Sequence, residues 1–208
     1  RIFQDEYIDS FRRMYQSIQP DILHLQEIYG YSAEQVRIGI SQWLSGTWYS
    51  AKVNDCITVS KYPILNTWAI DGNLATYIDT SQSIETEILC INAHLPCCSN
   101  EEGRQEESDA IMQFIREAYN EDGFINLDID TPVLIAGDLN LVGLSQQLDT
   151  LVTGDIQNES SYGPDFNPDP DNSSLTNIIS RQTEKRMGYT WRNDYSSYCP
   201  GQLDYLIF

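Results

Sequence analysis

Short β-prone runs alternate with helix-like segments along almost the whole chain, and this alternation constrains the fold more than any other feature. Runs rich in β-branched and apolar residues, bounded by Pro, Gly or polar turns, cover residues 22–28, 56–60, 68–70, 74–78, 88–93, 133–136, 189–191 and 203–208. Apolar residues at helical spacing cover residues 3–18, 36–44, 111–119 and 144–152. Interleaved strands and helices predict layered sheets with helices on the outside.

Helix-end signals support these boundaries. Pro20 stops the first helix, and Ser32 with Gln35 three residues later forms a capping box before the second. Ser99 or Asn100 caps a helix with an acidic first turn. Gly154 ends the later helix at residues 144–152. The polar, Pro-rich residues 155–188 predict a long surface loop, an excursion of the kind that often borders a functional site.

The length and composition fit a folded domain. The chain has 208 residues and 41% hydrophobic residues, which suits one domain with a proper core. Its apolar runs are all shorter than the ~20 residues needed to span a bilayer, so we predict no transmembrane segment. The oligomeric state does not follow from the sequence.

The formal net charge is −19, with 31 acidic and 12 basic residues. This charge repels nucleic acid at long range, so nonspecific binding through a broad basic face is not expected. A phosphoester substrate is still compatible with it, because bound cations reverse the sign of the potential locally. High acidity also suggests a secreted or extracellular protein.

The five cysteines do not form a disulfide framework. Their number is odd, and no C-x-x-C spacing indicates zinc or redox chemistry. Cys56 and Cys90 lie in strand-like runs and are expected in the core. Either Cys97 or Cys98 could pair with Cys199 across a loop, or the adjacent pair could keep a free thiol.

Four segments place metal- or phosphate-capable side chains where a strand gives way to a loop. They are 25–27 (Leu-Gln-Glu), 92–95 (Asn-Ala-His-Leu), 137–140 (Gly-Asp-Leu-Asn) and 202–205 (Gln-Leu-Asp-Tyr). Rigid strand ends are where sites are built. Oxygen ligands of this kind suit Mg²⁺, with Mn²⁺ as an alternative.

Each segment alone also has a structural interpretation. Glu27 could be a solvated carboxylate, His94 a core or surface histidine, and residues 137–140 a common turn. Asp204 could be an edge-strand charge. Arg104, after the His94 segment, could approach the substrate or pair with nearby glutamates.

The order of the four segments resembles the endonuclease/exonuclease/phosphatase superfamily, which includes DNase I-like nucleases, abasic-site endonucleases, bacterial sphingomyelinases and inositol polyphosphate 5-phosphatases. Further matching stretches are 59–64 (Val-Ser-Lys-Tyr-Pro-Ile) and 189–191 (Tyr-Thr-Trp). The resemblance spans nearly the whole chain. It implies a DNase I-like, four-layered α/β sandwich of two packed mixed β-sheets flanked by helices.

The resemblance also implies roles for five residues. Glu27 would hold the metal, and Asp138 would orient or deprotonate the attacking water. Asn140 would hydrogen-bond a phosphate oxygen, and His94 would stabilise the phosphate or donate a proton. Asp204 would orient a partner or assist protonation of the leaving group.

Two departures from the family pattern concern the chain ends. The family's first strand, which ends in a metal-supporting Asn, is missing before Phe3, and no closing Ser-Asp-His segment follows Asp204. We therefore expect residues 1–208 to be a single domain truncated at both ends. As it stands it is expected to be inactive or nearly so, because general acid–base catalysis contributes ~10²–10⁴-fold.

The predicted function is Mg²⁺-dependent hydrolysis of a phosphoester bond, by a phosphodiesterase, nuclease or phosphatase. The substrate could be a nucleic acid, a phospholipid head group or a small phosphate ester, and the few basic residues disfavour a long DNA footprint. The alternative is a non-catalytic binding module on the same scaffold.

Overall fold

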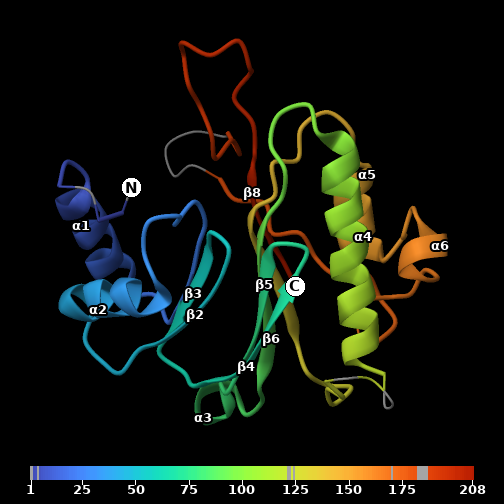
Figure 1. Ribbon diagram of the computed structural model, residues 1–208, viewed down its shortest axis with the longest axis horizontal. Helices are drawn as coiled ribbons and strands as arrows, with labels where there is room; N and C mark the ends of the chain where they lie inside the picture. The colour runs from blue at the N-terminus through green and yellow to red at the C-terminus, as the bar shows by residue number, and fades with distance from the viewer. Residues whose placement is uncertain (1, 4, 121–122, 124, 170, 182–186) are drawn as a thin grey trace. The chain divides into compact units, whose positions relative to one another are not determined.

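The computed structural model describes residues 2–3, 5–120, 123, 125–169, 171–181 and 187–208 (Figure 1). Its helices are α1 (Ile8–Ile18), α2 (Ala33–Trp43), α3 (Ser81–Ile84), α4 (Glu101–Ala118), α5 (Gln146–Thr153) and α6 (Glu159–Tyr162). Its strands are β1 (Ile22–Leu25), β2 (Tyr49–Val53), β3 (Cys56–Ser60), β4 (Ile64–Ile70), β5 (Asn73–Ile78), β6 (Ile88–His94), β7 (Val133–Asp138) and β8 (Asp204–Ile207).

The strands form two sheets, one of three strands in the order β1-β3-β2 and one of five in the order β4-β5-β6-β7-β8. The predicted α/β sandwich of two sheets with helices is therefore confirmed. Contacts cluster into two compact units, Arg1–Asn92 and Ala93–Phe208. Clusters of this kind also occur inside single domains, so the single domain stays a prediction.

In the first unit β3 is the buried centre of the three-stranded sheet. All five of its residues are buried, and it pairs antiparallel with both β1 and β2. The sequence analysis did not predict β2. Apolar and polar residues alternate only weakly along β2, and its residues are at most half-buried, as on an edge strand. Its backbone pairing with β3 is what identifies it as a strand.

Helices α1 and α2 enclose a hydrophobic core together with this sheet. Helix α2 contacts both β2 and β3. The buried members of the core are Ile2, Tyr15, Leu23, Ile28, Val36, Ile40, Leu44, Trp48, Ile57 and Val59. The three-stranded sheet also contacts β4 and β5, so within this unit two sheets pack on one another.

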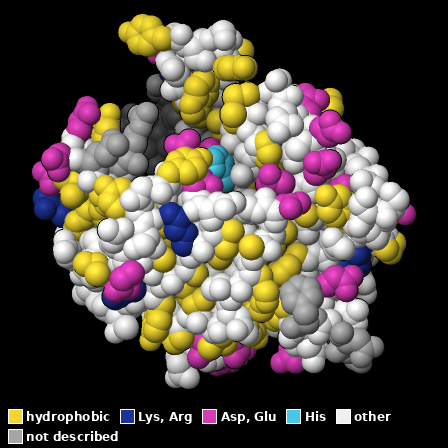
Figure 2. Space-filling model, in the orientation of Figure 1, with side chains coloured by type: hydrophobic (Ala, Val, Ile, Leu, Met, Phe, Trp, Pro, Cys, Tyr) yellow, Lys and Arg dark blue, Asp and Glu magenta, His cyan; other side chains and the backbone are white. Residues whose placement is uncertain are grey.

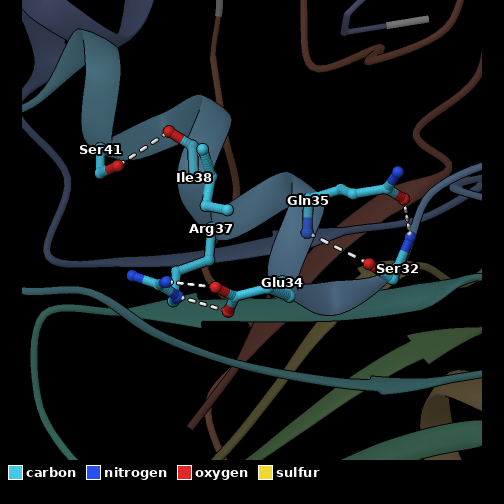
Figure 3. A network of polar contacts seen from close by, with 6 residues as sticks. All are labelled: Ser32, Glu34, Gln35, Arg37, Ile38 and Ser41. Atoms are coloured by element: carbon cyan, nitrogen blue, oxygen red, sulfur yellow. Dashed lines mark hydrogen bonds and ion pairs between the residues drawn. The ribbon is translucent and has the colours of Figure 1, made fainter.

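The start of α2 is fixed by the predicted capping box (Figure 3). The Ser32 hydroxyl accepts from the Gln35 backbone N–H at 3.2 Å, and the Gln35 side chain accepts from the Ser32 N–H at 2.8 Å. One turn later Arg37 forms an ion pair with Glu34. These contacts set where the chain leaves the loop that follows β1.

Asn92 joins the two sheets of the first unit. Its fully buried side-chain amide donates to the carbonyls of Ile57 (3.0 Å) and Leu25 (3.3 Å), and its Oδ1 accepts from Gln26 Nε2 at 2.6 Å. A strand of the five-stranded sheet is thereby tied to the ends of β1 and β3. Glu27 follows immediately in the sequence.

In the second unit β7 and β8 pair antiparallel, and α4 contacts α5 and α6. Asn100 caps α4 through a hydrogen bond from the Gly103 N–H. The strand predicted at 189–191 is reduced to an isolated bridge between Trp191 and Gly201. The loop 192–200, red in Figure 1, projects beyond this bridge.

The polar excursion after α5 is anchored by a buried carboxylate on α4. Asp109, 1% exposed, accepts hydrogen bonds from the backbone N–H groups of Gln157 (3.1 Å) and Asn158 (2.9 Å). Arg116 donates to the carbonyls of Tyr162 and Pro164. In the described part of the chain, no helix is long and apolar enough to cross a membrane.

Replacing Asn92 with Ala is expected to lower the free energy of unfolding by about 2 to 3 kcal/mol, because the buried Ile57 carbonyl, the part-buried Leu25 carbonyl and the Gln26 amide lose their partner. Urea denaturation measures the change. The matched control is Asn66→Ala on the exposed part of β4, with an expected change within about 0.5 kcal/mol. Equal effects of the two substitutions would contradict the role given to Asn92.

Candidate active site

Glu27 lies in the first unit, on a turn just after β1. Its side chain is exposed, and its backbone adopts the left-handed conformation, with φ of 59°. The Glu27 N–H donates to Asp55 Oδ2 at 2.9 Å, and the Ile28 N–H donates to the Asp55 carbonyl at 3.0 Å. Asp55, in the turn between β2 and β3, therefore fixes the direction in which Glu27 leaves the strand.

A tyrosine completes this carboxylate group. Tyr29 is exposed, and its pKa is raised by slight desolvation and then by the negative charges of Asp55 and Glu27. The Tyr29 hydroxyl also hydrogen-bonds Asp55. Both acidic side chains therefore contribute to a local negative potential that favours a cation.

In the second unit three predicted residues lie at the ends of paired strands. His94 ends β6 and Asp138 ends β7, and the N–H of Leu95 donates to the Asp138 carbonyl at 3.1 Å. Asp138 and Asp204 are direct partners in the antiparallel pairing of β7 with β8. The chain thus brings His94, Asp138 and Asp204 to one end of this strand group.

The residue Thr190 holds the start of β8 in place. Its hydroxyl accepts from the backbone N–H groups of Leu203 and Asp204, each at 3.0 Å. The Leu203 carbonyl in turn accepts from the Leu139 N–H at 2.8 Å. The register that sets Asp204 opposite Asp138 is therefore fixed by a side chain as well as by the ladder.

Asn140 is the fourth predicted residue in this unit. It is buried, with a left-handed φ of 49°, and its N–H donates to Asp138 Oδ1 at 3.2 Å. Its side-chain Nδ2 donates to the Leu95 carbonyl at 3.0 Å. Asn140 therefore contacts both the carboxylate of Asp138 and the loop that follows His94.

Arg104 hydrogen-bonds the loops that follow His94 and Asn140. Its side chain is fully buried, and Nη1 donates to the carbonyls of Pro96 (2.9 Å) and Cys98 (3.1 Å), while Nη2 donates to that of Val142 (3.4 Å). One guanidinium thus joins the loop after His94 to the loop after Asn140. Arg104 is therefore a positioning residue. Its hydrogen bonds go to backbone carbonyls, and it takes neither of the two roles considered from the sequence, substrate contact or pairing with a glutamate.

A cavity of about 250 Å³ adjoins Asn140. Its lining is mainly apolar and aromatic with three thiols, and consists of Cys97, Cys98, Asn140, Val142, Trp191, Tyr198, Cys199, Gly201 and Leu203. A larger depression of about 500 Å³ in the first unit, between α2 and strands β2 and β4, holds none of the five predicted residues. Of the five predicted residues, Asn140 lines the smaller cavity.

The carboxylates fit a hard cation in donor type. Mg²⁺ takes oxygen ligands, commonly one or two carboxylates with waters completing its shell. Glu27 and Asp55 offer such oxygens in the first unit, and the opposed Asp138 and Asp204 do so in the second. Among the described residues, no group of three or more His, Cys, Asp or Glu side chains has metal-binding geometry.

Sequence reasoning missed Asp55, Asn92 and Thr190 as supporting residues, and it considered Arg104 for other roles. All four act by hydrogen bonds to backbone or side-chain groups far from them in the sequence. Asn92 and Thr190 lay inside matched motifs, which is the signal that could have marked them. Asp55 carried no comparable signal, and the position of Arg104 after the His94 segment did not indicate that its partners are backbone carbonyls.

The chain belongs to the Endonuclease/Exonuclease/phosphatase family, whose model matches residues 5–206. This is a family of phosphoester hydrolases that includes nucleases and phosphatases. A search of curated protein sequences finds no significant match.

Solved structures give the same fold at low identity. TDP2 of D. rerio, complexed with single-strand DNA product, is 16% identical with a TM-score of 0.61, covering 96% of this chain and 74% of that one. A β-hairpin deletion mutant of Staphylococcus aureus beta toxin is 15% identical with a TM-score of 0.59, covering 99% and 81%. The DNase I-like fold class is thereby confirmed.

A third similar structure is the mannosyl-6-phosphatase of Bacteroides thetaiotaomicron, 15% identical with a TM-score of 0.53. The match covers 71% of this chain and 61% of the phosphatase, so it spans about three fifths of that protein's length.

Replacing Arg104 with Met is expected to lower the free energy of unfolding by about 3 kcal/mol, because three loop carbonyls lose a buried charged donor. Arg104→Lys is expected to be intermediate, since an ammonium cannot span both loops. Denaturant unfolding measures both. The control is Arg12→Met on exposed α1, and a stable Arg104→Met protein would contradict the described role.

Proposed function

We propose that this chain carries the hydrolytic site of a Mg²⁺-dependent phosphoester hydrolase. The observation that carries the proposal is the pairing of β7 with β8, which sets Asp138 opposite Asp204 beside the His94 loop. Membership of a phosphoester hydrolase family supports it. The roles below are those that these residues can perform chemically.

Asp138 is the residue that orients or deprotonates the attacking water. A carboxylate acts as a base when it is fixed and ionised, and the Asn140 N–H fixes Oδ1 of Asp138. Water then attacks phosphorus, and the bond from phosphorus to the leaving oxygen breaks. The water proton passes to the base, so the nucleophile is generated where phosphate binds.

His94 and Asp204 are assigned to the phosphate and the leaving group. His94 is half-buried at the end of β6, where an imidazole can stabilise the phosphate or donate a proton to the leaving oxygen. Asp204 is exposed opposite Asp138 and orients a partner or assists that proton transfer.

Asn140 supplies a neutral donor to the phosphate. Its side-chain amide carries two hydrogens, and the Leu95 carbonyl accepts from this Nδ2. The second hydrogen can donate to a phosphate oxygen. Because Asn140 is buried and held in a left-handed backbone conformation, its amide is preorganised for that contact.

Glu27 is the proposed metal ligand, with Asp55 beside it to strengthen the local field. When bound, Mg²⁺ supplies charge neutralisation and polarisation of the phosphoryl oxygen. Within the second unit, the opposed carboxylates Asp138 and Asp204 are themselves consistent with a bound cation, because like charges directly opposite on a sheet are otherwise destabilising. Mn²⁺ is the expected substitute.

The substrate is more consistent with a compact phosphoester than with a long nucleic acid. The net charge is −19, and Figure 2 shows many more Asp and Glu than Lys and Arg side chains on the face drawn. The neighbouring folds include a DNA-bound TDP2 and a mannosyl-6-phosphatase, so both phosphodiesters and phosphomonoesters belong in the assay.

Asp138→Asn is expected to lower kcat/KM about 10²–10⁴-fold, because the amide cannot accept the water proton. The measurement is hydrolysis of plasmid DNA, a phosphodiester and a phosphomonoester by the complete protein with Mg²⁺. The matched control is Asp71→Asn in the exposed turn between β4 and β5, which is expected to keep full activity.

Full activity of the Asp138→Asn protein would contradict the role of Asp138. Failure of the unmutated protein to hydrolyse any ester while it binds phosphate would favour a binding module on this scaffold.

Chelation by EDTA is expected to abolish hydrolysis, and added Mg²⁺ or Mn²⁺ to restore it, because oxygen donors hold these ions reversibly. Titration calorimetry with Mg²⁺ is expected to show weaker binding by Glu27→Gln than by the control Glu85→Gln, whose residue lies at the end of α3. Unchanged Mg²⁺ affinity in Glu27→Gln would exclude Glu27 as the ligand.

A further inference from the structure

Two adjacent thiols lie in the loop between β6 and α4. Cys97 and Cys98 are both exposed, and their Sγ atoms are 2.6 Å apart. A disulfide bond is ~2.05 Å long, so the two sulfurs are adjacent but not bonded. Cys98 has a φ of 66°, a left-handed conformation that a non-glycine residue rarely adopts.

The loop around the two thiols is held from below. Arg104 donates to the carbonyls of Pro96 and Cys98, on either side of Cys97. Asn140 donates to the carbonyl of Leu95, the residue that precedes Pro96. Because these carbonyls are fixed by buried side chains, the two thiols stay side by side in the folded protein.

We propose that Cys97 and Cys98 form a reversible oxidation site that closes to a disulfide between neighbouring residues. The co-reactant is a small-molecule disulfide such as oxidised glutathione. One thiolate attacks it, forms a mixed disulfide and releases one small thiol, and the neighbouring thiolate then displaces the second. The protein loses two electrons and two protons, and the small disulfide gains them as two thiols.

The bond is easily reduced because its geometry is strained. Consecutive Cα atoms are ~3.8 Å apart, below the usual 4.4–6.8 Å between disulfide-bonded residues. Strained, exposed disulfides have higher reduction potentials than structural ones, which makes them reversible. The site is therefore a reversible thiol pair rather than a structural disulfide.

The other cysteines define the competing outcomes. Cys56 and Cys90 are fully buried, and burial raises the pKa of Cys90 to about 12, so it forms little thiolate. Cys199 is exposed and lines the same cavity as Cys97 and Cys98, so it is the one rival partner among the exposed cysteines. In the structure the Sγ atom of Cys97 contacts the Sγ atom of Cys98 and not that of Cys199.

Closure of this pair changes the wall of the cavity beside Asn140. Asn140, to which the proposed function assigns a phosphate contact, lines this cavity, but the oxidation itself does not depend on catalysis. Mass and thiol measurements can therefore test the oxidation site even if the proposed hydrolase activity fails.

The experiment treats the native, reduced complete protein with oxidised glutathione at mildly alkaline pH, because the hydrogen bond with Cys98 raises the pKa of Cys97. Intact mass and thiol titration follow the reaction. Cys199→Ser is expected to lose two reactive thiols, to retain no glutathione and to recover with dithiothreitol. The unmutated protein is expected to show the same loss at residues 97 and 98, with glutathione retained only on the exposed Cys199. The Cys97→Ser/Cys199→Ser double variant is expected to retain one glutathione, on Cys98.

Peptide mapping of the oxidised, unmutated protein identifies the linkage. A bond between Cys97 and Cys98 supports the proposal. A bond from either residue to Cys199, or a Cys199→Ser protein that keeps glutathione or leaves both thiols reduced, overturns it. Circular dichroism checks that each variant is folded.

Discussion

The antiparallel pairing of β7 with β8 is the constraint on which the rest of the candidate site depends. Its register sets Asp138 against Asp204, and a shift of β8 by one residue would turn the Asp204 side chain to the other face of the sheet. Thr190 secures that register from outside the ladder through two backbone N–H groups. The ends of these strands therefore hold acidic groups in a fixed relation before any substrate arrives.

Buried polar side chains, rather than apolar packing alone, position the loops around these strands. Arg104 joins the loops that follow His94 and Asn140, and Asp109 anchors the excursion after α5. In the other unit, Asn92 connects β6 to the ends of β1 and β3. Each of these groups is costly to bury unless it is paired, so each favours one arrangement of the backbone.

Much of this arrangement was predictable from local sequence, and the rest was not. The strands around Cys56–Ser60 and Val133–Asp138 follow from apolar runs, and the capping box at Ser32 follows from two residues at fixed spacing. The edge strand β2 was missed because its residues carry almost no pattern. Arg104 was misjudged because its partners are backbone carbonyls up to 38 residues away, which have no side-chain signature.

The central claim is that a water molecule attacks the phosphorus of a phosphoester at the site around Asp138. Hydrolysis in water labelled with oxygen-18, followed by mass spectrometry of both products, tests it most directly. Attack by water on phosphorus predicts that the label enters the phosphate-containing product and that the alcohol product stays unlabelled. Label in the alcohol product, or product formation with no label in either, would contradict it.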